Sequence, residues 1–185
     1  MATADEQSRR LFVAVPLPES AVPFAVQSQA LLPRNGSLRL LDPGRLHCTL
    51  AFIGRADSRA TEAARAVVAG VPAECGGEAA LSQFLLLPTA QRVRVVALAV
   101  DDRNGVFAKL FETVMAGLEA ALVMKREERA YRAHVTIARL REPGRVQPMS
   151  DCGQAAFGVE SVCLYESELR RQGAVHTVLM RRDLR

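Results

Sequence analysis

The sequence predicts an α+β fold whose sheets are largely antiparallel. Short β-rich segments follow one another in pairs separated by turn residues, which is typical of hairpins. Other segments carry apolar residues at helical spacing instead. The chain has 185 residues, of which 49% are hydrophobic and 24% are charged, an ordinary globular balance. This length and composition predict one domain over residues 1–185, with residues 1–8 as a flexible tail.

The first third of the chain predicts a strand, a helix and two further strands. The opening segment is a run of β-formers that ends at Pro16, and the next segment carries apolar residues at helical spacing until Pro33. Two short alternating segments follow, with a turn at Asp42-Pro43-Gly44 between them. These elements are the strand 10–16, the helix 19–32 and the strands 37–41 and 45–53.

The middle of the chain predicts a helix, a hairpin and a second, longer helix. Asp57 or Ser58 is suited to cap the first helix, and Gly70 and Pro72 follow it. Asn104 is suited to cap the longer helix, whose apolar stripe repeats about every 3.6 residues. These elements are the helix from 57 or 58 to 68, the strands 78–87 and 92–100, and the helix whose stripe spans 106–122.

The last part of the chain predicts three strands. One alternating segment is followed by Pro143-Gly144, and two more near the C-terminus form a terminal hairpin. They are the strands 132–140, 157–166 and 174–182. The complete order of elements is β-α-β-β-α-β-β-α-β-β-β.

The charge of the chain permits a phosphate-bearing partner without requiring one. The formal net charge is +4, and the basic residues are 22 Arg and two Lys. A planar guanidinium suits phosphate recognition better than an ammonium group does. No apolar run reaches the roughly 20 residues of a membrane span, and the N-terminus lacks the pattern of a secretory signal. We therefore expect no membrane association and a cytoplasmic location.

The four cysteines predict neither a disulfide scaffold nor a zinc site. They form no C-x-x-C pair, and no cluster of possible ligands stands near them. Cys48 and Cys163 lie within apolar alternations, where each is expected to act as a small buried hydrophobe. We expect no metal and no cofactor.

The most informative feature is a weak internal repeat that contains two of the three histidines. His47-Cys48-Thr49 can be aligned with His134-Val135-Thr136, and the flanking aliphatic and alanine positions also match. Only seven of the 185 residues are Thr, so two such His-x-Thr spacings are unexpected by chance. The remaining histidine, His176, has no Thr two residues later, and we interpret it as structural or incidental.

Strand geometry gives this repeat a chemical meaning. Residues two apart on a strand share a face, about 6–7 Å from each other, so each His lies beside its Thr while the residues between them enter the core. Two such strands related by an approximate two-fold axis would direct four polar side chains into one groove. Two imidazoles can supply a general acid and a general base near neutral pH, and two hydroxyls can hold anionic oxygens. This set suits a phosphodiester and requires no metal and no covalent intermediate.

On these residues the sequence resembles the 2H phosphoesterase family, named for its two His-x-Thr-x motifs. Within that family it is most similar to the bacterial and archaeal RNA 2′,3′-cyclic phosphodiesterases, formerly called 2′-5′ RNA ligases. The resemblance covers most of residues 9–183. It includes the opening strand, both motifs and the closing segment, at residues 10–18, 46–54, 132–139 and 164–167.

The resemblance implies a bilobal fold with two pseudo-symmetric sheets around a central cleft and helices packed outside. It also implies hydrolysis of a terminal 2′,3′-cyclic phosphate to a 2′-phosphate. His47 would be the proton donor to the leaving 3′ oxygen, and His134 the proton acceptor that activates water. Thr49, Thr136 and Arg139 would bind the phosphate. The expected partners are RNA 3′ ends or nucleoside 2′,3′-cyclic phosphates, and we expect a monomer.

Spacing leaves two of the candidate residues with alternative roles. Arg139 lies three residues after Thr136, so on a regular strand it faces away from the histidines, where a surface ion pair is the alternative. Phe12 is a candidate to stack on a base, with a place in the core as its alternative. The chain departs from the usual family pattern at Leu40, Ala133 and His176, and it has no Trp. Base stacking would therefore depend on Phe or Tyr.

Two other functions remain as alternatives. A 2′-5′ RNA ligase or 2′-5′ phosphodiesterase would use the same two histidines on a linear bond. A non-catalytic RNA-end-binding module would keep the pocket without turnover, but binding alone does not need two titratable groups. The presence of both His-x-Thr motifs therefore favours an enzyme.

Overall fold

The computed structural model describes residues 8–34, 36–126, 129–170 and 173–184. Residues 1–7 of the predicted tail lie outside these ranges. Within the described part, no helix is long and apolar enough to cross a membrane. The expected location and the expected monomeric state stay predictions.

The strands form one curled, nine-stranded sheet in the order β7-β4-β5-β6-β3-β1-β8-β9, with β2 paired to β6. Every pairing is antiparallel, as the sequence predicts. The strands are β1 (Arg9–Pro16), β2 (Leu38–Leu40), β3 (His47–Ala56), β4 (Gly77–Leu87), β5 (Val93–Asp101), β6 (His134–Gly144), β7 (Ala155–Val159), β8 (Ser161–Arg170) and β9 (Gly173–Asp183).

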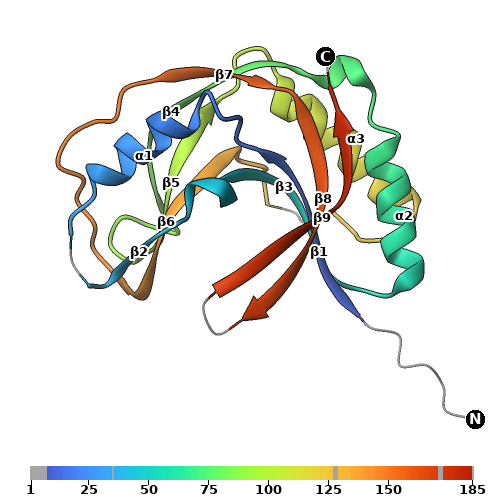
Figure 1. The fold of residues 1–185 in the computed structure, drawn as a ribbon, viewed down its shortest axis with the longest axis horizontal. Coiled ribbons are helices and arrows are strands. Elements are labelled where there is room, and N and C mark those ends of the chain that lie inside the picture. The colour runs from blue at the N-terminus through green and yellow to red at the C-terminus, as the bar shows by residue number, and fades with distance from the viewer. Residues whose placement is uncertain (1–7, 35, 127–128, 171–172, 185) are drawn as a thin grey trace, which may run out of the picture.

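The sheet consists of two halves that meet between β3 and β6. In the described residues these two strands share a single paired position, Cys48 opposite Val135. One half contains β7, β4, β5 and β6, and the other contains β3, β1, β8 and β9. Figure 1 shows that the whole sheet bends into an arch. The predicted α+β fold with two antiparallel halves is confirmed, and the two halves join into one continuous sheet.

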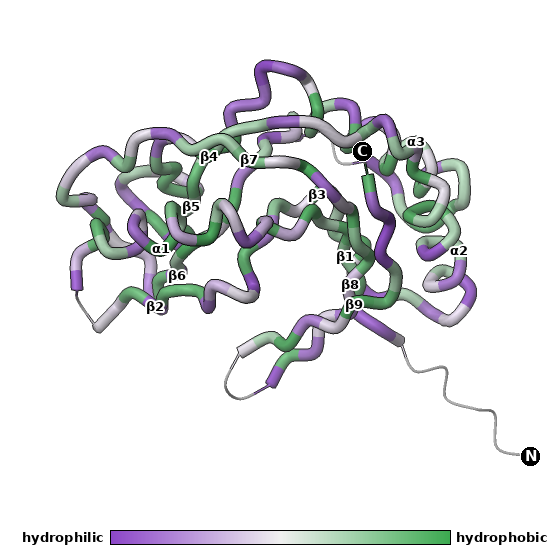
Figure 2. Tube along the Cα trace, turned by 45° about the horizontal axis from the view of Figure 1, so that its top comes forward, coloured by the Kyte–Doolittle hydropathy of each residue, from purple (hydrophilic) through white to green (hydrophobic). Residues whose placement is uncertain are grey.

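Among the described residues, three helices cover this sheet: α1 (Val22–Ala30), α2 (Ser58–Ala69) and α3 (Val106–Ala120). Helices α2 and α3 lie side by side on one arm of the arch, and α1 lies on the other arm (Figure 1). In Figure 2, α2 alternates between hydrophilic and hydrophobic segments, as expected for a helix with one face against a sheet. Two short 3₁₀ segments span Pro43–Arg45 and Ala73–Cys75. The first of them delays the start of β3 to His47, two residues later than predicted.

Helix α1 is shorter than predicted and is attached to the sheet by a buried polar side chain. It begins at Val22, with Pro23 in its first turn, where a missing N–H costs no helical hydrogen bond. The Gln29 amide donates hydrogen bonds to the carbonyls of Leu41 (2.8 Å) and Ile137 (2.9 Å). These bonds satisfy a buried polar group and tie α1 to β6, the strand that carries His134.

The predicted capping residue of α3 is wrong. The Asp102 carboxylate accepts hydrogen bonds from the backbone N–H groups of Phe107 (3.0 Å) and Ala108 (2.9 Å). Asn104 instead donates from its side chain to the Glu78 carbonyl. Gly105 stands between them with φ of +68°, a conformation that glycine adopts without strain and that folds the loop back over Asp102. A carboxylate at this position also interacts favourably with the helix dipole.

The predicted strand 157–166 is two strands. Strand β7 pairs with β4 in one half of the sheet, while β8 pairs with β1 and β9 in the other. The chain crosses between the halves at Glu160, whose carbonyl accepts a hydrogen bond from the Leu184 N–H. Glu160 and Ser161 interrupt the apolar residues here, but two polar residues within a β-rich segment do not by themselves indicate a change of partner. The predicted terminal hairpin is confirmed as β8 and β9, and Cys48 and Cys163 are buried as predicted.

We predict that Asp102→Ala lowers the free energy of unfolding by about 1–2 kcal/mol, because two N–H groups at the start of α3 lose their acceptor. Asn104→Ala is the matched control and should cost no more than a few tenths of a kcal/mol, since Asn104 caps no helix. Urea unfolding of the wild type and both variants measures the difference. An equal loss in both variants would contradict the observed cap.

Candidate active site

The two His-x-Thr motifs meet at the junction between the halves of the sheet. Cys48 and Val135 are paired and buried, while each flanking His and Thr is half-buried. Because β3 and β6 are antiparallel, His47 is directed toward Thr136 and Thr49 toward His134. The predicted arrangement, with four polar side chains on one face and aliphatic residues behind them, is therefore what the fold contains.

Each histidine is held by a hydrogen bond of the same kind, to the backbone carbonyl two residues before it. His47 Nδ1 lies 2.7 Å from the Arg45 carbonyl oxygen, and His134 Nδ1 lies 2.7 Å from the Arg132 carbonyl oxygen. A carbonyl only accepts, so each Nδ1 carries its proton and donates. This bond orients each ring and leaves Nε2 as the nitrogen available to exchange a proton.

A bulge at the same place in each motif changes which residues share the face with the histidines. In β6, Thr136 and Ala138 pair with consecutive residues of β5, so Ile137 is an extra residue. Ile137 and Ala138 are both buried, and Arg139 returns to the exposed side. The regular strand on which Arg139 would face away from the histidines is therefore not what the fold contains, and the role of Arg139 in binding phosphate stays a prediction. In β3 an equivalent bulge exposes Phe52.

The comparisons with known proteins agree with this geometry. A Thermus thermophilus protein named RNA 2′,3′-cyclic phosphodiesterase is 30% identical over 187 residues, which cover 95% of this chain and 90% of that protein. The crystal structure of TT0787, also from Thermus thermophilus, matches with a TM-score of 0.83 at 29% identity, covering 95% of this chain and 98% of that one. The chain belongs to the 2H phosphoesterase family.

Other comparisons concern the fold alone. The structure of E. coli LigT complexed with 3′-AMP matches with a TM-score of 0.81 at 21% identity, over 96% of this chain and 99% of that chain. No family model matches the chain. As a 2H phosphoesterase, the protein is a hydrolase of phosphodiesters, and its curled sheet with three helices is the LigT-like fold.

In this 2H phosphoesterase, His47 is surrounded by aromatic rings. Its ring centroid lies 5.1 Å from Phe12, 6.1 Å from Tyr165 and 5.6 Å from His176. The pKa of His47 is lowered from 6.5 to about 4, chiefly by burial. The hydrogen bond to the Arg45 carbonyl opposes this shift, and the interactions with His176, Arg139 and His134 add smaller contributions that lower the pKa. His47 is therefore neutral at pH 7 in the free protein.

Phe12 does not offer a face on which a base could stack. The side chain is only 3% exposed, its ring is stacked on Tyr165 at 5.0 Å, and His176 meets it edge-on at 4.9 Å. The interpretation of Phe12 as a base-stacking residue is corrected to a place in the packed wall behind His47. Phe52, 67% exposed, is the aromatic ring of this 2H phosphoesterase that faces solvent beside the motifs.

His176 is the residue of the site that sequence reasoning missed. It stands on β9 opposite Ser167 of β8, and its ring meets His47 edge-to-face. Burial lowers its pKa, with smaller contributions in the same direction from Arg45 and Arg139. In the sequence, His176 lacks the Thr two residues later that marks the other two histidines. The available signal was that His176 is one of the positions at which the chain departs from the usual family pattern.

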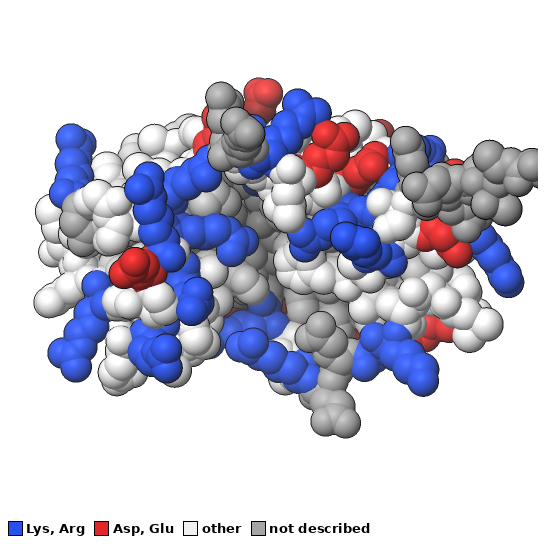
Figure 3. Space-filling model, turned by 90° about the horizontal axis from the view of Figure 1, so that it is seen from below, with Lys and Arg blue, Asp and Glu red and all other residues white. Residues whose placement is uncertain are grey.

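The groove that contains the motifs is basic. Arg139 and Arg45 are close enough for their charges to act on the neighbouring histidines. Figure 3 shows the face of this 2H phosphoesterase that is hollowed at its centre, with Lys and Arg side chains on both sides of the hollow. Within the described residues, no three His, Cys, Asp or Glu side chains are grouped so as to hold a metal ion. The two histidines and the nearby guanidinium groups equip the groove for proton transfer beside an anion.

We predict that the acid sensitivity of stability is smaller in His47→Asn. An unfolded His47 takes up a proton as the pH falls through 6.5, whereas the folded protein takes it up only near pH 4, so stability is lost between these values. The wild type should lose up to about 3 kcal/mol more than the variant between pH 7 and pH 4. Urea unfolding at a series of pH values measures this, and parallel losses in both proteins would contradict the burial of a neutral His47.

Proposed function

We propose that this protein is an RNA 2′,3′-cyclic phosphodiesterase that hydrolyses a terminal 2′,3′-cyclic phosphate to a 2′-phosphate without a metal ion. The observation that carries the proposal is the pair of identically oriented histidines on two strands that meet at one residue pair. The name of the Thermus thermophilus relative supports the same substrate class. The substrates would be RNA 3′ ends or nucleoside 2′,3′-cyclic phosphates.

The reaction needs two proton transfers at one phosphorus atom. His134 Nε2 takes a proton from water while the water oxygen forms a bond to phosphorus. The bond from phosphorus to the 3′ oxygen breaks, and His47 Nε2 gives that oxygen a proton. The 2′ ester bond remains, so the product is a 2′-phosphate and the two histidines exchange protonation states. This division of roles follows the family resemblance.

The remaining polar groups hold the phosphate during these transfers. Thr49 and Thr136 each lie beside a histidine on the same strand face, where a hydroxyl can donate to a non-bridging oxygen. Arg139, which the bulge in β6 returns to the exposed side, places a positive charge near His47. Donors in fixed positions stabilise the charge that builds up on these oxygens in the transition state.

Because the pKa of His47 is low in the free protein, the bound substrate must raise this pKa before His47 can act as a proton donor. A neutral imidazole cannot donate a proton to the leaving oxygen, but a phosphodiester anion beside the ring stabilises the imidazolium. In this proposal His47 gains its proton together with the substrate. The anion thereby offsets the burial that lowers the pKa of this group in the free protein.

We predict that saturating inorganic phosphate raises the pKa of His47 well above the value of about 4 in the free protein. A titration of the His ring nitrogens by ¹⁵N NMR, with and without phosphate, measures the change. If His47 stays neutral with phosphate bound while His134 becomes protonated, the roles of donor and acceptor are exchanged.

We predict that His47→Ala and His134→Ala each lower the turnover of adenosine 2′,3′-cyclic phosphate by at least ~100-fold, as expected when an acid or base is lost. The assay is run with EDTA present, because no metal takes part in the proposed reaction. Circular dichroism and thermal unfolding are the controls that both variants remain folded. Full activity in either variant would contradict the two-histidine mechanism.

The same assay separates the alternative functions. A 2′-5′ phosphodiesterase or ligase would turn over a 2′-5′-linked dinucleotide faster than a cyclic phosphate. An RNA-end-binding module would bind the cyclic phosphate without turnover. Hydrolysis of the cyclic substrate in preference to the dinucleotide is the expected result.

A further inference from the structure

The two half-sites are matched in chemistry but differ in their surroundings. Beside His47, the space is filled by the rings of Phe12, Tyr165 and His176. Beside His134 and Thr49 there is instead a cavity of about 440 Å³. This volume is within the range of roughly 300–1,000 Å³ that is usual for small-molecule sites. The described residues therefore provide room for the organic part of a substrate on the His134 side of the reacting phosphate.

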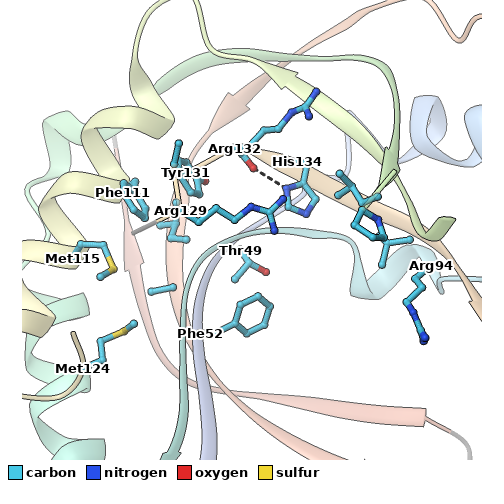
Figure 4. Close-up of a pocket in the computed structure, with 16 residues that line it drawn as sticks. Thr49, Phe52, Arg94, Phe111, Met115, Met124, Arg129, Tyr131, Arg132 and His134 are labelled. Carbon is cyan, nitrogen blue, oxygen red and sulfur yellow. Dashed lines mark hydrogen bonds between the residues drawn. The ribbon is translucent and has the colours of Figure 1, made fainter. Parts of the chain in front are cut away.

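The inner part of this cavity is suited to a flat apolar group. Phe111 and Tyr131 are stacked on each other at 4.2 Å, and Met115 and Met124 lie near them on the wall (Figure 4). Methionine sulfur packs favourably against aromatic rings and adapts its shape to them. The cavity contains no Asp or Glu among its described lining residues. These lining residues therefore place no carboxylate against an electron-rich heteroaromatic ring bound in the cavity.

The outer part of the cavity is cationic and continuous with the motifs. Arg94, Arg129 and Arg132 line it together with Thr49 and His134. Figure 4 shows the Arg129 side chain extending from the apolar end toward His134. Guanidinium groups both stack on bases and bind phosphate oxygens, so this part suits the sugar-phosphate portion of a nucleotide. The cavity thus has an apolar end and a cationic end, and the cationic end adjoins the motifs that would hold the reacting phosphate.

We propose that this cavity is the subsite for the nucleoside that carries the reacting phosphate. The base lies at the apolar end against Met124 and the Phe111–Tyr131 pair, and the ribose lies between it and the motifs. The phosphate on the 5′ side of that nucleoside faces Arg129 and Arg132. Phe52, exposed at the mouth, covers the base. The inference rests on the proposed function. It also sets the orientation of the substrate, with the nucleoside on the His134 side of the phosphate and not on the His47 side.

The test compares a substrate with a base and one without. Adenosine 2′,3′-cyclic phosphate and methyl riboside 2′,3′-cyclic phosphate share the reacting group, and only the first has a base. Met124→Trp fills the apolar end of the cavity, and Met149→Trp, at a side chain that is 69% exposed and does not line the cavity, is the matched control. Met124→Trp should lower kcat/KM for the adenosine substrate by about tenfold or more and for the baseless substrate by less than about twofold. Met149→Trp should change neither value.

Other outcomes have definite meanings. Equal losses on both substrates, or no loss on the adenosine substrate, would overturn the subsite. A loss that appears only with a dinucleotide substrate would assign the cavity to another nucleoside and would also overturn it. A wild type that turns over neither cyclic phosphate would overturn the proposed function, and the subsite with it. Phe52→Ala, at an exposed ring, repeats the comparison if Met124→Trp does not fold.

Discussion

The position at which β3 and β6 meet is the constraint on which the site depends. Each half of the sheet has its own strands and its own His-x-Thr motif, and the halves join through one pair, Cys48 with Val135, within the described residues. Because that pair lies in the middle of both motifs, each histidine faces the threonine of the other half. A shift of one strand by one residue at this junction would turn the His and Thr of that strand to the opposite face from those of the other. The bulges after the motifs lie in the pairings of β6 with β5 and of β3 with β1, and they bring Arg139 and Phe52 back to the groove.

The local symmetry of the motifs is not continued by the residues around them. Both rings donate through Nδ1 to a carbonyl at the same distance, which gives the two histidines equal geometry. Their environments then separate them, because aromatic rings enclose His47 and a cavity opens beside His134. When two groups of one type have different surroundings, their pKa values can differ, and one can then act as an acid while the other acts as a base. In this protein the buried Cys48–Val135 pair sets the relative position of the two motifs, and the different residues beside each histidine make their environments unequal.

Much of the fold and the centre of the site could be predicted from the sequence. The antiparallel sheet follows from alternation and turn residues, and the paired motif was visible because histidine and threonine are rare in this chain. Features that depend on tertiary pairing could not be predicted. A bulge leaves no mark in the sequence, so spacing alone could not place Arg139 on the face of the histidines, and only the family resemblance did. The break at Glu160 is marked only by the polar pair Glu160-Ser161, which a single strand could also contain. His176 reaches His47 only through the register of β8 with β9. The α3 cap is Asp102 because a glycine folds the loop back.

The central claim is that both histidines act on one phosphate from opposite sides. A crystal structure of the protein with vanadate and adenosine, which together imitate a five-coordinate phosphate, tests this claim most directly. The account predicts one vanadium centre in the groove, with the Nε2 atoms of His47 and His134 each within roughly 2.6–3.2 Å of a different apical oxygen. A vanadate bound to one histidine while the other histidine contacts no oxygen of that centre would contradict it.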